Sequence, residues 1–142
     1  MQIRRIKPAE CLEAHRFVQM VVDETYAYIW RKGAPPIDAT DWSPAWVADN
    51  GSSIIALLLT GHEWIEDLWI EANFRRKGLG AALLSKGERE IAERGFPLAR
   101  LRVVASNEAA IAFYRQQGWT EVRRYQHSRL PIEMIDFNKQ LS

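Results

Sequence analysis

The sequence predicts an α/β protein built on a mixed β-sheet, and three observations support this class. Apolar segments joined by turn residues, such as Asn50-Gly51, indicate antiparallel hairpins. A strand over residues 64–70, a glycine loop, a helix from Leu79 and a strand over residues 98–105 form a βαβ crossover, so this strand pair is parallel. Amphipathic helical stretches between the strands would flank the sheet.

The first 43 residues predict one strand, two helices and a loop. Residues 2–7 alternate apolar and basic side chains, as a half-buried strand does. Pro8 opens a helical stretch. Residues 26–30 predict a second, short helix, which the Gly-Ala-Pro-Pro run at 33–36 ends. Residues 37–43 predict a loop.

The middle of the chain predicts three consecutive strands joined by tight turns. They cover residues 45–49, 54–59 and 64–70. The first turn is expected at Asn50-Gly51 and the second at Thr60-Gly61.

The second half of the chain predicts two helices and three strands. The helix from Leu79 is ended by Gly95 and Pro97. Asn107 has the side chain of a helix N-cap, and Gly118 ends the helix that it begins. The strands follow at residues 98–105, 119–125 and 132–138. The predicted order is therefore β-α-α-β-β-β-α-β-α-β-β.

The bulk composition predicts a single domain over residues 1–142. The chain is 47% hydrophobic and 26% charged, as globular proteins are. A net charge of +1 gives no argument for a nucleic-acid or membrane partner. Cys11 is the only cysteine, which excludes an internal disulfide and favours a reducing compartment. Because neither a signal-peptide pattern nor an apolar run of about 20 residues occurs, we expect a cytoplasmic protein.

The run Arg75-Arg76-Lys77-Gly78-Leu79-Gly80 predicts a site for a phosphorylated ligand. The first N–H groups of a helix have no acceptor inside it, and the helix dipole adds positive charge there. Glycine lets the backbone approach a phosphate closely. The alternative is an ordinary solvated run of charges. The run is not a P-loop, since no Gly-Lys-Ser/Thr follows.

Two segments resemble the GNAT superfamily of acetyl-CoA-dependent N-acetyltransferases. Asp67-Leu68-Trp69-Ile70 followed by Arg75-x-x-Gly78-x-Gly80 is similar to the family's acetyl-CoA loop. Asn107-x-x-Ala110-x-x-Phe113-Tyr114-x-x-x-Gly118-Trp119 resembles its second motif, with Trp119 in place of the usual phenylalanine. The resemblance covers residues 64–119. It implies a mixed, mostly antiparallel central sheet with a splayed parallel strand pair, flanked by helices.

The resemblance also implies acetyl-CoA as co-substrate and no metal. Backbone groups of the strand end and the glycine loop would bind it, together with Asn107 and Tyr114 of the second motif. The residues so implied are Leu68, Trp69, Ile70, Arg75, Arg76, Lys77, Gly78, Leu79, Gly80, Ala81, Asn107 and Tyr114. Capping of its helix alone would also explain Asn107.

Two residues are implied as catalytic. Glu66 shares a strand face with Leu68 and lies in a segment similar to that of diamine acetyltransferases, where the glutamate is the proposed base. Asp67, Glu63, His62 or an ordered water are the other candidates. Tyr114 would protonate the leaving thiolate, as the family's tyrosine does. The structural alternatives are a surface acid for Glu66 and a packing aromatic for Tyr114.

The function predicted in this way is transfer of an acetyl group to a primary amine of a small molecule or peptide. The alternative is a GNAT fold that binds acyl-CoA without turnover, as a sensor or interaction module. A nucleic-acid module has little support, because the basic residues gather in one loop. The sequence leaves the acceptor and the oligomeric state open, a homodimer included.

Overall fold

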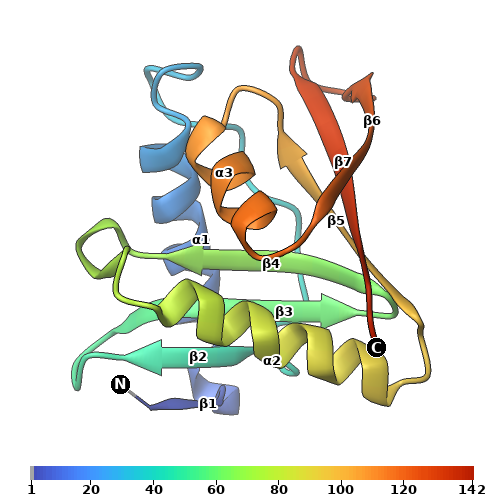
Figure 1. The fold of residues 1–142 in the computed structure, drawn as a ribbon. Helices are drawn as coiled ribbons and strands as arrows, with labels where there is room; N and C mark the ends of the chain where they lie inside the picture. Colours follow the sequence, from blue (N-terminus) through green and yellow to red (C-terminus); the bar gives the residue numbers. More distant parts are fainter. Residues whose placement is uncertain (1) are drawn as a thin grey trace. The chain divides into compact units, whose positions relative to one another are not determined.

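The computed structural model describes residues 2–142 and shows a mixed α/β fold (Figure 1). The elements in chain order are β1 (Ile3–Arg5), η1 (Pro8–Glu10), α1 (Cys11–Thr25), β2 (Trp46–Asp49), β3 (Ile54–Gly61), β4 (Trp64–Ile70), η2 (Ala72–Phe74), α2 (Leu79–Glu93), β5 (Leu98–Val104), α3 (Glu108–Gln116), β6 (Thr120–Gln126) and β7 (Glu133–Gln140). Strand pairing follows the order β1-β2-β3-β4-β5-β7-β6. One neighbouring pair, β4 with β5, is parallel, with Trp64 opposite Arg100. The predicted fold class is confirmed.

The chain divides into two compact units, which we call the N-terminal and C-terminal units. The N-terminal unit contains Met1–Leu59 and Asp67–Lys86, and the C-terminal unit contains Thr60–Glu66 and Gly87–Ser142. The long elements β3, β4 and α2 each contribute residues to both.

In the N-terminal unit, α1 packs on one face of the strands. Its inward side chains, Ala14, Phe17, Val18 and Val21, form a buried cluster with strand residues that include Val47, Leu57 and Leu59. The opposite face of β2 is covered by α2, since the ammonium of Lys86 lies 3.9 Å from the ring centre of Trp46. Burial on both faces explains why β3 is a continuous apolar run rather than an alternating one.

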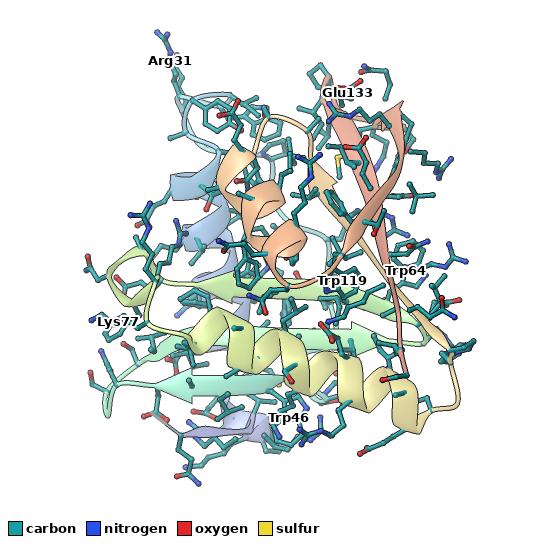
Figure 2. All side chains as sticks on the ribbon, viewed as in Figure 1. Arg31, Trp46, Trp64, Lys77, Trp119 and Glu133 are labelled. Carbon is teal, nitrogen blue, oxygen red and sulfur yellow. The ribbon has the colours of Figure 1, made fainter. Side chains whose placement is uncertain are left out.

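In the C-terminal unit, β5, β7 and β6 form an antiparallel ladder in which Leu101 faces Phe137. The α3 side of this ladder is apolar, with Leu101, Ile135 and Phe137 buried. Trp119, labelled in Figure 2, is 3% exposed, and its indole N–H donates to Glu88 over 3.1 Å. Glu88 also binds the ammonium of Lys139 at 2.8 Å, so one carboxylate joins α2 to β7.

Two sequence predictions about local structure are wrong. Residues 26–30 form turns instead of a second helix, with a single helical turn closed by Trp30 N–H donating to Tyr26 O. One isolated turn fixes many dihedral angles for few hydrogen bonds. Here the chain turns away instead, because Asp23 Oδ1 accepts from the backbone N–H of Ala34.

The second error concerns the turn between β3 and β4. β3 continues through Thr60 and Gly61, and the turn falls at His62 and Glu63. His62 takes a left-handed conformation with φ of 53°. The first hairpin is confirmed, although its loop is wider than Asn50-Gly51: the Asn50 carboxamide accepts from the N–H groups of Ser52 and Ser53.

Arg4 on β1 links two carboxylates and makes a pH-dependent contribution to stability. Its guanidinium binds Glu10 at 2.8 Å and Asp49 at 2.8 Å. The hydrogen bond from Arg4 lowers the pKa of Glu10 from 4.5 to about 2, and the N–H of Lys7 adds to this shift.

We expect Glu10→Gln to lower the free energy of unfolding by about 1–3 kcal/mol at pH 7, after allowance for partial exposure. A depressed folded-state pKa stabilises the fold above the unfolded value of 4.5, and this contribution is lost as pH falls toward about 2. Denaturant unfolding of both proteins between pH 7 and pH 2.5 checks it. A difference that stays constant over this range would contradict the assignment.

Candidate active site

The glycine loop lies between η2 and α2 in the N-terminal unit. Arg76 and Gly78 both have left-handed backbone, with φ of 62° and 82°. These two residues reverse the chain so that α2 begins at Leu79 immediately after the loop. A Cβ built on Gly78 meets no atom within 4 Å, so the space above this residue is open. The loop therefore presents a helix start with room for a ligand against its backbone.

The cations of the loop have different surroundings. The Arg75 guanidinium donates to the carbonyl of Ile70 at 3.0 Å and to the hydroxyl of Thr25 at 3.4 Å. It thus joins the loop to the end of β4 and to the last residue of α1. The Lys77 ammonium lies 5.6 Å from the ring centre of Phe74. Arg76 is exposed.

A cavity of about 350 Å³ adjoins the loop in the same unit. It is lined by Ile3, Phe74, Lys77, Gly78, Leu79 and Ala82. Apolar walls with one cation and a glycine backbone suit an organic group that carries phosphate.

The end of β4 supplies Leu68, Trp69 and Ile70, all half-buried. Trp69 packs against the core cluster of α1, and its indole N–H donates to Asp67 over 2.9 Å. The carbonyl of Ile70 already accepts from Arg75.

Glu66 lies in the C-terminal unit, on the exposed part of β4. Its carboxylate leans over Gly61 of β3, where an added Cβ would come within 2.7 Å of Oε1. Gly61 therefore makes the space that Glu66 occupies, which sequence reasoning missed. Among residues 2–142, Glu66 forms no hydrogen bond or ion pair, which leaves its carboxylate available to a ligand.

Two of the other base candidates, Asp67 and Glu63, have side-chain partners of their own. Asp67 accepts from the Trp69 indole, and Glu63 faces the Arg100 guanidinium at 4.0 Å. His62 is exposed in the turn, and its carbonyl accepts from Arg94.

Tyr114 and Asn107 belong to α3. The half-buried Tyr114 ring makes edge contacts with Phe113 and Trp119, at centroid distances of 5.3 and 6.3 Å. It also packs against Phe137 at 6.3 Å. The Asn107 side chain accepts from the N–H of Ala110 over 3.1 Å, which confirms the predicted N-cap.

Residues 2–142 contain neither a candidate membrane span nor a cluster of metal ligands. None of the described helices has the length and apolar character needed to cross a membrane. In the same part of the chain, no three His, Cys, Asp or Glu residues come together as metal ligands would.

The fold and the loop define a class: a mixed-sheet α/β protein whose crossover loop presents an open glycine at a helix start. Comparison with known proteins then gives the family. The sequence profile of the acetyltransferase (GNAT) family matches residues 15–119. The chain therefore belongs to this family.

Solved structures share the fold. A ribosomal-protein-alanine N-acetyltransferase from Brucella melitensis superposes with a TM-score of 0.76 at 21% identity, over 99% of this chain and 100% of that one. yncA from Salmonella typhimurium, solved with its cofactor acetyl-CoA, gives 0.73 at 16% identity, over 100% and 94%. An uncharacterised N-acetyltransferase of Methanocaldococcus jannaschii is 33% identical over 57 residues, which is 40% of this chain and 25% of that protein.

Proposed function

We propose that this protein transfers the acetyl group of acetyl-CoA to a primary amine of a small molecule or a peptide. The observation that carries the proposal is the loop: left-handed Arg76 and Gly78, open space above Gly78, and the start of α2, in a chain of the acetyltransferase (GNAT) family. The acetyl-CoA bound to yncA supports the same co-substrate.

Backbone N–H groups from Arg76 to Ala81 would bind the pyrophosphate, with Lys77 adding positive charge. Arg75 would hold the loop in place through Ile70 and Thr25. Leu68, Trp69 and Ile70 would offer backbone groups to the amide-rich pantetheine arm, as an added strand does. Asn107 contributes through the helix that it caps, and its amide N–H groups would serve the same arm.

Glu66 would accept the proton of the acceptor ammonium, directly or through a water. The neutral amine attacks the thioester carbonyl, the carbon–sulfur bond breaks, and the thiolate takes the proton of the Tyr114 hydroxyl. Formation of the amide releases a second proton from the nitrogen, which restores the Tyr114 hydroxyl, and the proton held by Glu66 passes to solvent. The products are an N-acetylated amine and free CoA.

Thermal unfolding in the presence of acetyl-CoA and a panel of amines tests the proposal. A ligand that binds the folded state raises the melting temperature by mass action. We expect acetyl-CoA to raise it, and CoA with one class of amine to raise it further. A protein stabilised by neither acetyl-CoA nor CoA would contradict the proposal.

Gly78→Ala tests the loop directly. The added Cβ enters the open space, and φ of 82° strains any L-residue by about 1–2 kcal/mol. Loss of a backbone approach to a charged phosphate costs about 1.5–3 kcal/mol, so the Kd for acetyl-CoA should rise about 10- to 100-fold.

Gly51→Ala is the matched control. Gly51 also has positive φ, 96°, with nothing within 4 Å of its added Cβ, but it lies in the β2–β3 loop. Calorimetric titration should show a similar loss of stability in both variants and weaker acetyl-CoA binding only in Gly78→Ala. Equal binding by the two variants would remove the loop from the site.

A further inference from the structure

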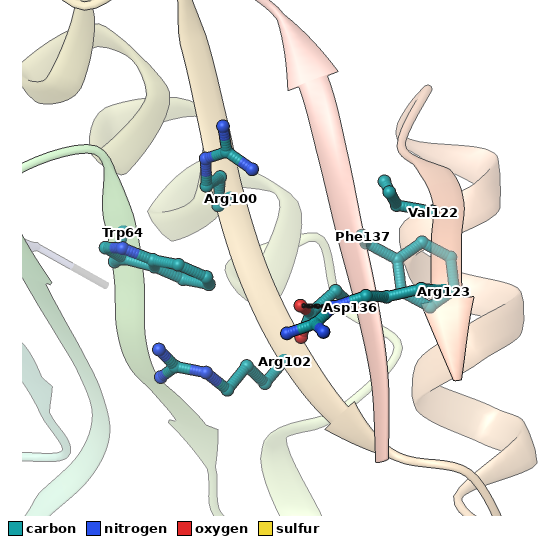
Figure 3. A pocket seen from close by; sticks show the side chains of 7 residues that line it. All are labelled: Trp64, Arg100, Arg102, Val122, Arg123, Asp136 and Phe137. Atoms are coloured by element: carbon teal, nitrogen blue, oxygen red, sulfur yellow. Dashed lines mark hydrogen bonds and ion pairs between the residues drawn. The ribbon is translucent and has the colours of Figure 1, made fainter. Parts of the chain in front are cut away.

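A second pocket, in the C-terminal unit, has the chemistry of an anion site. It measures about 350 Å³ and is lined by side chains from β4, β5, β6 and β7 (Figure 3). Arg100 and Arg102 point outward because Ala99, Leu101 and Val103, which alternate with them along β5, are buried. The lining residues are Trp64, Arg100, Arg102, Val122, Arg123, Asp136 and Phe137.

Arg102 is held by an aromatic ring and not by a carboxylate. Its guanidinium carbon lies 4.0 Å from the ring centre of Trp64, a cation–π contact. Within residues 2–142, no carboxylate lies within 4.0 Å of the Arg102 nitrogens. A planar guanidinium fixed by its face keeps its N–H edges for a bidentate acceptor.

The other charged side chains in and beside the pocket indicate which ligand charge it would match. Arg123 binds Asp136 at 2.9 Å, and Asp136 also accepts from the Tyr125 hydroxyl at 2.8 Å. Arg100 faces Glu63 at 4.0 Å. Three guanidiniums and two carboxylates leave one net positive charge, which matches a monoanion such as a carboxylate better than a phosphate dianion.

Trp64, which lines the pocket, lies on the same strand as Glu66. Trp64 and Glu66 are two residues apart, so their side chains share a face, about 7 Å apart along the strand. Both residues belong to the C-terminal unit.

From these observations we propose that Arg102, stacked on Trp64, binds a carboxylate of the acceptor, so that the preferred acceptor is an amine bearing an acidic group about 7 Å or more away. This inference rests on the proposed function, because it takes Glu66 as the site of the amine. Arg102 is then a specificity-determining residue, and Trp64 positions it.

The test compares 5-aminopentanoate with its neutral amide, 5-aminopentanamide. The wild-type protein should have a lower KM for the acid than for the amide. Arg102→Gln should raise the KM for the acid about 10- to 100-fold, the value of a charged hydrogen bond of about 1.5–3 kcal/mol. It should leave the KM for the amide and for acetyl-CoA unchanged. Arg102→Lys keeps the charge and loses the planar edge, so its KM for the acid should lie between those of wild type and Arg102→Gln.

Arg124→Gln is the matched control, since it removes the same charge from an exposed arginine that pairs with Glu121 outside the pocket. Its KM for the acid should stay within twofold of wild type. No preference for the acid, or an equal effect of Arg102→Gln on acid and amide, would overturn the inference while acetyl transfer stands.

A binding measurement separates this result from failure of the proposed function. Calorimetric titration of each probe in the presence of CoA requires no turnover. Binding of the acid over the amide, abolished by Arg102→Gln, supports the anion site even if neither probe is acetylated. Equal or absent binding of both probes, together with absent turnover, would overturn the site.

Discussion

Tyr114→Phe is expected to lower kcat about 100-fold or more, with the KM for acetyl-CoA unchanged. The substitution removes one hydroxyl and keeps the ring contacts with Phe113, Trp119 and Phe137, so the fold should be intact. A thiol has a reference pKa near 8.5, and a positioned proton donor contributes about 10²- to 10⁴-fold to such a step. Steady-state kinetics with melting curves of both proteins measure the effect.

Tyr28→Phe is the control for this variant. Tyr28 is 57% exposed and lies in the turn after α1, outside the proposed site. It should retain wild-type kcat. A Tyr114→Phe protein with wild-type kcat would remove the tyrosine from the chemistry.

Glu66→Gln is expected to lower kcat/KM for the amine by about 10²- to 10⁴-fold at pH 7. An alkyl ammonium has a reference pKa near 10.4, so the nucleophilic amine is scarce at neutral pH and a base must supply it. As pH approaches 10, free amine becomes abundant and the deficit should shrink. A merely structural role for Glu66 would not produce this convergence.

Rate profiles from pH 6 to pH 10 measure it, with Glu93→Gln as the control. Glu93 is exposed at the end of α2 and should give the wild-type profile. A deficit of the same size at every pH would contradict a base at Glu66. The base would then be sought among Asp67, Glu63 and His62, although Asp67 and Glu63 have partners of their own.

Elements with strong local signals could be predicted from the sequence. The strand at residues 64–70 is observed with those bounds, because alternation and flanking turn residues mark both ends. The Asn107 cap and the positive φ of Gly118 at the end of α3 depend only on the residue types at the two ends of the helix, which the sequence shows directly.

What could not be predicted depends on contacts between distant residues. The observed turn places His62 in the left-handed conformation. In the sequence, the preceding Thr60-Gly61 is a stronger turn signal than His62. The link from Arg75 to Thr25 spans 50 residues, so the sequence shows a charged loop without showing which cation holds it. The space that Gly61 leaves for Glu66 is likewise a contact between two strands.

The residues of the candidate site likewise include some that motifs predicted and some that only contacts in the structure reveal. The glycine loop and α3 were identified from motifs, whereas the choice of Glu66 over its neighbours gains its support from side-chain partners that only the structure displays. Arg102 carries no motif. Alternation with buried Leu101 was a signal for its exposure, but its contact with Trp64 was not visible in the sequence.

The reaction proposed for this chain is acetylation of an amine with acetyl-CoA. Its most direct test follows free CoA with a thiol reagent and the acetylated amine by mass spectrometry in one time course. We expect one amine class to release CoA in equal amount to its N-acetylated product, and Tyr114→Phe to slow both equally. CoA release no faster than without protein for every amine, or release without acetylated product, would contradict it.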